Sequence, residues 1–174
     1  MESITSLALQ EFFKRLGEQV PTRATFYLMG GSALCLLGSP RETLDVDYSI
    51  EDAPPEIETV LKQLAAELRL DLEAVPMAEF IPLPPEAEQR RRLVGRYGQV
   101  DVYIFDLYSI ALSKVARGFE SDLEDVEFLL DHDFIEWNML ETHFKTIFPL
   151  VGGADIEPKE FQQYFDTLKR KRGK

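Results

Sequence analysis

The stretch FYLMGGSALCLLGSPRETLDVDYSI, which spans Phe26–Ile50, contains the signals that decide the fold. The apolar run Thr25–Met29 predicts a buried strand, and the two glycines that follow it end that strand. Ala33–Leu37 predicts a short buried helix. The alternating residues of Asp45–Ile50 predict a second strand whose side chains point to opposite faces in turn. A strand, a glycine turn, a helix and a second strand in this order indicate an α/β arrangement.

The segments around this stretch continue the mixed pattern. Apolar residues at 9, 12, 13 and 16 predict a first helix that ends near Gly17. Further strands are predicted at residues 70–75, 93–97 and 100–105, the last two joined as an antiparallel hairpin. From Asp106, a predicted N-cap, the pattern is helical, with Gly118 ending one helix and a capping box at Ser121 opening the next. We therefore expect an α/β (α+β) fold, with a core at residues 1–106 that has a mixed sheet flanked by helices, and a C-terminal helical bundle at residues 107–174 packed on it.

Charge and composition argue against several classes of protein. The chain has 19 basic and 31 acidic residues, a net charge of −12, which disfavours a protein that coats nucleic acid with a positive surface. The longest apolar run, Ala33–Leu37, is far shorter than the roughly 20 residues that cross a bilayer, so no membrane association is expected. Cys35 is the single cysteine. It fits a reducing cytoplasm and a small buried apolar role.

Gly30, Gly31 and Ser32 form a candidate phosphate site. Glycines let the backbone approach a ligand closely, and the free N–H groups at the start of a helix suit an anion. A plain strand-to-helix turn has the same sequence, so the residues alone leave both interpretations open.

Asp45 and Asp47 are candidate metal ligands. Residues i and i+2 of a strand project from the same face, so the two carboxylates lie together. Carboxylate oxygens suit Mg²⁺, which binds one or two of them together with substrate phosphates. Asp101 lies in the apolar strand of the predicted hairpin, and a metal shared with Asp45 and Asp47 would offset the cost of burying its charge. The alternative for the pair is a solvent-facing edge strand.

Together, the glycine turn, the D-x-D pair and the later acid resemble the signature of the nucleotidyltransferase superfamily, which has a polymerase-β-like fold. That signature is a Gly-Gly/Ser turn, a spacer, a D-x-D pair on a strand and a third acid on a later strand. Twelve residues separate Ser32 from Asp45 here. Within the superfamily, the segments Arg41–Asp47 and Ser113–Val126 resemble the small AbiEii-type and MenT-type toxin-related nucleotidyltransferases.

The resemblance implies a nucleotidyltransferase-like mixed sheet and a reaction. Gly30, Gly31 and Ser32 would hold the phosphates of an NTP, while the acids Asp45, Asp47 and Asp101 would bind two Mg²⁺ ions and form the catalytic centre. The enzyme would transfer NMP from the NTP to a hydroxyl of an RNA, a protein or a small molecule. A toxin role, with an antitoxin protein as partner, is a further implication. The alternative is a catalytically inactive protein of this fold with a binding or regulatory role.

Other charged residues are candidates of a second rank. Lys114 and Arg117 lie one turn apart on a predicted helix and either face the triphosphate or form a solvent-exposed pair. Arg41 either reaches a phosphate from its loop or pairs with a nearby acid. Asp122 and Asp125 are expected to serve a helix N-terminus.

An RNA acceptor would have to dock locally, because the overall field of the chain is negative. Candidates are the arginines before and within the predicted hairpin: Arg90, Arg91, Arg92 and Arg96. The alternative for them is a solvated charged face.

Overall fold

The computed structural model describes residues 2–152 and 155–174, and the chain forms two compact units. One, the sheet unit, contains the chain up to Pro76 and the segment Arg91–Phe105. The other, the helical unit, contains Met77–Arg90 and the chain from Asp106 onward. The sequence analysis predicted a boundary between residues 106 and 107, which would assign Met77–Arg90 to the unit that contains the sheet. In the structure Arg90 pairs with Asp106 at the start of a helix, which ties that segment to the helical unit.

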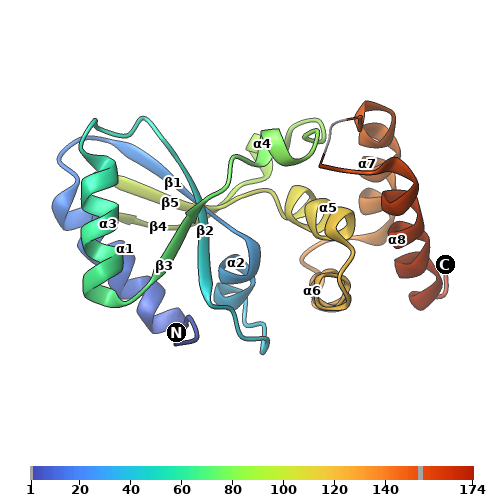
Figure 1. Cartoon of the computed structure of the whole chain (residues 1–174), viewed down its shortest axis with the longest axis horizontal. Coiled ribbons are helices and arrows are strands. Elements are labelled where there is room, and N and C mark those ends of the chain that lie inside the picture. Colours follow the sequence, from blue (N-terminus) through green and yellow to red (C-terminus); the bar gives the residue numbers. More distant parts are fainter. Residues whose placement is uncertain (1, 153–154) are drawn as a thin grey trace. The chain divides into compact units, whose positions relative to one another are not determined.

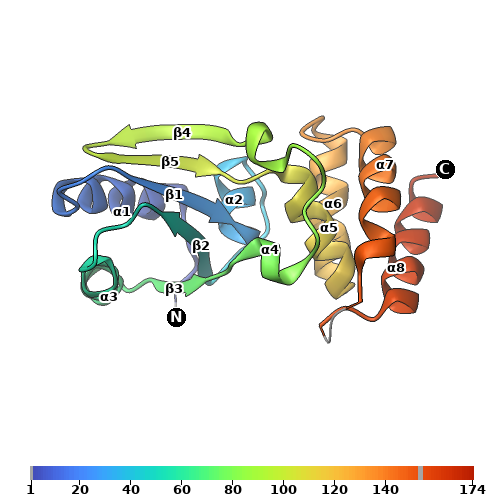
Figure 2. The ribbon, with the colours of Figure 1, turned by 90° about the horizontal axis from the view of Figure 1, so that it is seen from above.

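The sheet unit is built on five strands in the order β3-β2-β1-β5-β4 (Figures 1 and 2). Strand β1 pairs parallel with β5 and antiparallel with β2, β2 pairs parallel with β3, and β4 pairs antiparallel with β5. The expected mixed sheet and the expected antiparallel hairpin are both present. The strands are β1 (Ala24–Met29), β2 (Asp45–Glu51), β3 (Asp71–Ala74), β4 (Arg92–Tyr97) and β5 (Val100–Ile104).

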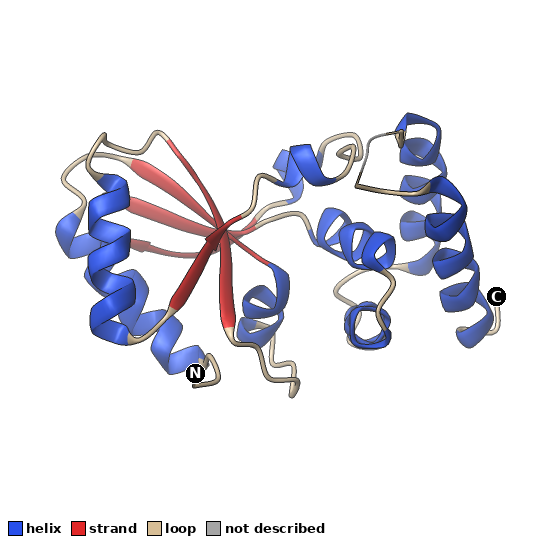
Figure 3. Ribbon diagram, viewed as in Figure 1, coloured by secondary structure: helices blue, strands red, loops and turns tan. Residues whose placement is uncertain are grey.

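Helices α1 (Ser6–Gln19) and α3 (Ile57–Leu68) cover one face of this sheet, while α2 (Gly30–Leu36) follows β1 (Figure 3). The buried ring of Phe26 packs edge-on against Phe12 and Phe13 of α1 and stacks on Tyr48 of β2. Such aromatic contacts are typical of a tightly packed core. The side chains that share a face with Phe26 and Tyr48 therefore point toward the helices, and their strand neighbours point to the opposite side, here called the second face.

Helix α1 ends at Gln19, near the predicted end at Gly17, but Gly17 itself lies within the helix. A Cβ on Gly17 would lie 2.3 Å from the carbonyl oxygen of Tyr97. The glycine is required because the helix backbone approaches the β4–β5 turn closely, and its position in the sequence does not mark a cap.

The helical unit comprises short helices α4 (Met77–Phe80), η1 (Ala87–Arg90) and η2 (Phe148–Leu150) and longer helices α5 (Leu107–Arg117), α6 (Glu120–Asp131), α7 (Trp137–Ile147) and α8 (Pro158–Lys171). Phe144 of α7 stacks on Phe165 of α8, with ring centroids 3.9 Å apart, and Trp137 also stacks on Phe165. Apolar aromatic packing therefore joins α7 to α8. Within the described part of the chain, no helix has the length and apolar character needed to cross a membrane.

The predicted ends of α5 are confirmed. Asp106 caps its start by accepting hydrogen bonds from the backbone N–H groups of Tyr108 and Ser109, and Gly118 ends it in the left-handed conformation. The capping box predicted at Ser121 is wrong, because α6 already begins at Glu120 after an N-cap residue, Phe119, that makes no side-chain bond.

His143 is a buried titratable group of the helical unit. It is 6% exposed, its ring lies 5.0 Å from that of Tyr108, and its Nε2 atom has no hydrogen-bond partner in the structure. Burial lowers the pKa of His143, the positive charge of Arg90 lowers it further, and the negative charge of Asp106 raises it in part. The folded protein therefore disfavours the charged imidazolium.

We predict that His143 makes the protein less stable in mild acid. The unfolded chain takes up the proton near the ordinary histidine pKa of about 6.5, before the folded state does, so stability falls as pH drops below that value. Melting temperatures measured between pH 7.5 and 5.5 should decline less in His143→Phe than in the parent. His132→Phe, which changes the exposed second histidine, should follow the parent, and equal slopes in all three proteins would contradict the prediction.

Candidate functional site

The turn after β1 is held against the carboxylate of Asp47. The antiparallel register of β1 and β2 pairs Met29 with Asp47, so the turn that starts at Gly30 lies beside the D-x-D pair. Gly30 has φ +62°, and a Cβ there would lie 2.2 Å from Oδ2 of Asp47. Only glycine combines this left-handed conformation with so close an approach. The structure therefore brings together two of the three motif elements found in the sequence.

Gly31, the second glycine of the turn, lies against the loop before β2. A Cβ on Gly31 would meet Oγ1 of Thr43 at 2.8 Å and Nη2 of Arg41 at 3.8 Å. The backbone of Thr43 is tied down in turn by a hydrogen bond from the N–H of Ile4. The guanidinium of Arg41 thus lies near the glycine turn.

The hydroxyl of Ser32 is not presented to a ligand in this structure. Ser32 is fully buried and donates a hydrogen bond of 3.0 Å to the carbonyl oxygen of Met29. The side chain closes the first turn of α2, a local role that Ser commonly takes. Of the three expected phosphate-binding residues, only the two glycines therefore leave their backbone available to a ligand.

Asp45 and Asp47 project from the second face of the sheet. Their strand neighbour Tyr48 stacks on Phe26 on the helix-covered face, so the aspartates point the other way. The parallel register of β2 and β3 places Asp71 opposite Asp45 and Glu73 opposite Asp47. Four carboxylates of two adjacent strands therefore share this face.

This concentration of acids alters the chemistry of Asp45. Partial burial raises the pKa of Asp45, and a side-chain hydrogen bond to Asp71 and the negative charges of Asp71 and Glu73 raise it further. Asp71 and Glu73 were missed as candidates, although the i, i+2 spacing of two acids on a predicted strand was the signal that could have found them. The excess negative charge is what a bound cation would relieve.

Asp101 does not join the two aspartates, which corrects the expected three-acid centre. It pairs with Thr25 of β1, whereas Asp47 pairs with Met29. The three acids share a face, but four residues of β1 separate the two positions, or about 13 Å at strand spacing. Asp101 instead forms ion pairs of 3.3 Å with Arg96 and 3.9 Å with Arg23, which compensate its charge.

The donor set therefore fits one Mg²⁺ ion better than two. Across residues 2–152 and 155–174, no three side chains of His, Cys, Asp or Glu are arranged to hold a metal ion. Two carboxylates on one face can still bind Mg²⁺ when substrate phosphates supply further oxygens. Asp45 and Asp47 match that chemistry, while a second ion would lack Asp101.

Lys114 and Arg117 lie in the helical unit and form a charge cluster with Asp122 and Asp125. Lys114 is 5% exposed and contacts Asp125 at 2.8 Å and Asp122 at 3.8 Å. Arg117 donates two hydrogen bonds to the buried carboxylate of Asp122. Asp122 lies in the first turn of α6, as expected, whereas Asp125 lies beyond that turn. Both aspartates also pair with cations across the α5–α6 contact, which the sequence did not predict. Lys114 is likewise not the solvent-exposed residue that one interpretation expected.

The four arginines expected at an RNA acceptor have different surroundings. Arg90 donates two hydrogen bonds of 2.9 Å to the fully buried carboxylate of Asp106, so its proposed contact with RNA is replaced by a structural role. Arg91 turns toward two tyrosines of the sheet unit. Arg92 and Arg96 lie on β4, the edge strand of the sheet.

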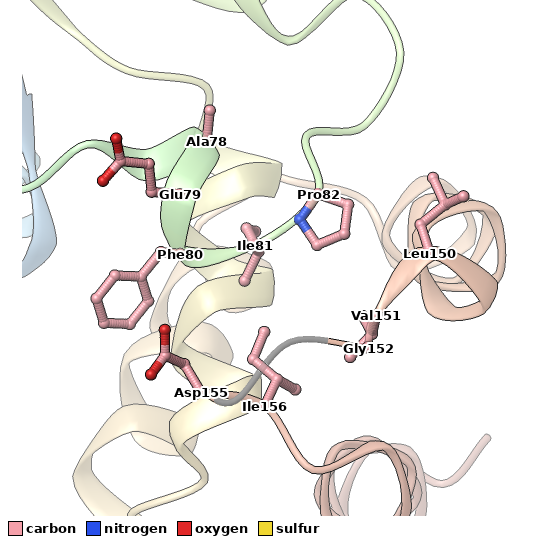
Figure 4. Close-up of a pocket in the computed structure, with 10 residues that line it drawn as sticks. All are labelled: Ala78, Glu79, Phe80, Ile81, Pro82, Leu150, Val151, Gly152, Asp155 and Ile156. Atoms are coloured by element: carbon pink, nitrogen blue, oxygen red, sulfur yellow. The ribbon is translucent and has the colours of Figure 1, made fainter.

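A pocket of about 220 Å³ lies elsewhere, in the helical unit (Figure 4). Its lining is largely apolar and includes the half-exposed ring of Phe80 and the side chains of Glu79 and Asp155. None of the residues expected at the site lines it. The pocket and the acidic face of the sheet are therefore separate features of the molecule.

Comparison with known proteins identifies a family and a similar solved structure. Residues 7–172 match the model of a protein family described as nucleotidyltransferase of unknown function (DUF6036). The chain belongs to this family. It is also similar to a solved antigenic nucleotidyltransferase-like protein from Paracoccidioides brasiliensis, at 18% identity and a TM-score of 0.53, over 99% of this chain and 92% of that one. This likeness shows the nucleotidyltransferase-like fold. No curated protein matches the chain in sequence.

We predict that Gly30→Ala destabilises the protein through the contact with Asp47. The left-handed conformation alone should cost about 1–2 kcal/mol, and displacement of the carboxylate should add to that cost. Gly38→Ala is a matched control, since Gly38 also has a positive φ but no atom within 4 Å of the added Cβ. Chemical denaturation should show the larger loss for Gly30→Ala, and part of it should disappear in an Asp47→Ala background. Equal losses at both glycines would contradict the prediction.

We also predict that the Lys114 cluster stabilises the helical unit. Lys114→Met leaves two buried carboxylates with less compensation and should cost about 3 kcal/mol of unfolding free energy. Lys145→Met removes a 71% exposed lysine that pairs with Glu141 on the same helix face and should change stability by about 0.5 kcal/mol or less. A loss below about 1 kcal/mol for Lys114→Met would show that the cluster is not a structural ion pair.

Proposed function

We propose that the protein is an enzyme that transfers NMP from a Mg²⁺-bound NTP to a hydroxyl group of an acceptor. The observation that carries this proposal is the contact between the Gly30 turn and the carboxylate of Asp47. It places a backbone turn with no side chains next to a pair of acids on one sheet face. Membership of a nucleotidyltransferase family supports the same reaction class.

In the proposed complex, Asp45 and Asp47 would hold one Mg²⁺ ion, which supplies charge neutralisation for the phosphates. The side-chain-free surface of Gly30 and Gly31 leaves room for the triphosphate, and Arg41 at that turn contributes positive charge. The acceptor oxygen forms a bond to the α-phosphorus, the α–β phosphoanhydride bond breaks, and pyrophosphate leaves. The hydroxyl proton passes to water. Catalysis in such a site is mainly positioning and charge stabilisation.

Three expected nucleotide-binding groups have no part in this proposal. The hydroxyl of Ser32 is used by the backbone of Met29. Lys114 and Arg117 are engaged with Asp122 and Asp125 within the helical unit. Their contacts support a structural function.

For the acceptor, we propose RNA, bound through Arg92 and Arg96 on the edge strand β4. In a chain with a net charge of −12, two arginines on the exposed edge strand are the local basic feature that favours contact with a polyanion, although their sheet partners place them on opposite faces. A protein or a small molecule would be an alternative outcome of a labelling experiment. The toxin role and an antitoxin partner follow only from the resemblance of the sequence motifs.

A second candidate function is that of a catalytically inactive binding protein with this fold. The observation that favours it is the position of Asp101, which forms ion pairs with Arg23 and Arg96 away from the other two acids. A protein that kept the fold for interaction alone would not need a third acid at the site.

We predict that the parent transfers label from at least one α-³²P-labelled NTP in the presence of Mg²⁺, and that Asp47→Asn abolishes the transfer. Each of the four NTPs would be incubated with total RNA, a protein extract and a small-molecule fraction. Because Asp47 is one of four crowded carboxylates, its neutralisation should leave the melting temperature of the metal-free protein unchanged or raise it. Addition of EDTA should stop the reaction.

Glu11→Gln, an exposed substitution on α1, serves as the charge-matched control and should transfer label like the parent. Mg²⁺–NTP binding without any transfer, measured by calorimetry, would favour the inactive binding protein. Absence of both binding and transfer in the parent would overturn the proposed function. A large drop in the melting temperature of Asp47→Asn would assign Asp47 a structural role instead.

A further inference from the structure

Arg91 holds a guanidinium group in a fixed position on the second face of the sheet. Its Nη1 atom donates a hydrogen bond of 2.9 Å to the hydroxyl of Tyr27, and its Cζ atom lies 4.1 Å from the ring centroid of Tyr103. The rings of Tyr27 and Tyr103 are neighbours on β1 and β5, with centroids 5.9 Å apart. A hydrogen bond and a cation–π contact together restrict an otherwise flexible side chain.

This position lies close to the proposed nucleotide site. Tyr27 is two residues before Met29, whose partner across β2 is Asp47. The backbone of Asp47 is therefore displaced from that of Tyr27 by two residues along the strand direction and by one strand spacing, which together give about 8 Å. Tyr27, Tyr103 and Asp47 also share a face, because each alternates with residues that point toward the helices. A ligand held by Asp47 could therefore extend to the guanidinium.

The surroundings of Arg91 differ from those of the neighbouring arginines. Arg90 contacts the carboxylate of Asp106, and Arg96 contacts that of Asp101. Arg91 instead contacts two uncharged phenols and is exposed. The hydrogen bond to Tyr27 is the main cause that raises the pKa of the guanidinium, and the charge of Glu51 is a smaller one. Its positive charge is thus held in place by groups that do not neutralise it. Such an arrangement suits an anion, because little side-chain entropy is lost on binding.

We propose that Arg91 binds a phosphate group of the triphosphate held at Asp45 and Asp47, an inference that rests on the proposed function. Carboxylates at one end of the face and a guanidinium at its centre provide complementary partners for a metal–polyphosphate complex. Tyr27 and Tyr103 act as positioning residues, since they orient Arg91 and need not touch the ligand themselves.

Calorimetric titrations with Mg²⁺–tripolyphosphate and with each Mg²⁺–NTP test this assignment. Arg91→Gln should weaken the binding of tripolyphosphate and of the preferred NTP by the same factor, about tenfold or more, as expected for loss of a charged hydrogen bond. Arg91→Lys, which keeps the charge and most of the stem, should lose less. Tyr27→Phe should also weaken both ligands, by a smaller factor, because it removes the hydroxyl that orients the guanidinium.

Arg23→Gln is the matched control, because Arg23 is a highly exposed arginine that pairs with Asp101 at the other end of the face. It should bind both ligands like the parent. Undiminished tripolyphosphate binding by Arg91→Gln would overturn the assignment while leaving the proposed function intact. If only NTP binding is weakened, Arg91 contacts the nucleoside and not a phosphate group. A parent that binds no Mg²⁺–NTP and no Mg²⁺–tripolyphosphate would overturn both. If Arg91→Gln does not fold, as judged by circular dichroism, the Tyr27→Phe and Arg91→Lys titrations decide.

Discussion

The antiparallel register that sets Met29 opposite Asp47 is the constraint on which the candidate site depends. It brings the end of β1 against the D-x-D pair so closely that only a glycine in the left-handed conformation can follow Met29. The same register turns Tyr48 onto Phe26 and therefore directs both aspartates away from the helix-covered face. A shift of one residue would reverse every side chain of β2, burying carboxylates among phenylalanines. Core packing and site geometry thus stabilise the same pairing.

The aspartates of the sheet unit differ in whether a positively charged side chain lies beside them. Asp101 has two arginine partners, whereas partial burial raises the pKa of Asp45, and its neighbours Asp71 and Glu73 raise that pKa further. An acid in a strand is tolerable when a counter-charge lies beside it, and it becomes a candidate ligand when further acids lie there instead. In the helical unit, the cluster around Lys114 follows the first pattern. The ion pairs therefore support a structural role for Asp101, Asp122 and Asp125.

Local sequence patterns determined most of the secondary structure. The alternation of β2, the apolar run of β1, the capping residue Asp106 and the terminating Gly118 are consequences of strand and helix geometry over a few residues. For the same reason, the pairing of Asp45 with Asp47 on one face could be predicted, since it depends only on the two-residue period of a strand. These short-range features indicated an α/β fold, and the nucleotidyltransferase-like fold was expected from the resemblance of the motifs to the superfamily signature.

Only the tertiary structure decided which distant residues meet. The position of Asp101 depends on the register of β5 against β1, which no local pattern specifies. That register shifts this acid about 13 Å along the strands from Asp47, and β1 also lies between them. Contacts across elements also gave Lys114 its two carboxylate partners, closed Ser32 onto Met29, and turned Arg91 onto two tyrosines. The residues that flank each of these side chains in the sequence do not reveal whether the side chain is exposed or paired. Their roles are set by which chain segments pack together, because charge compensation and burial are properties of neighbours in space.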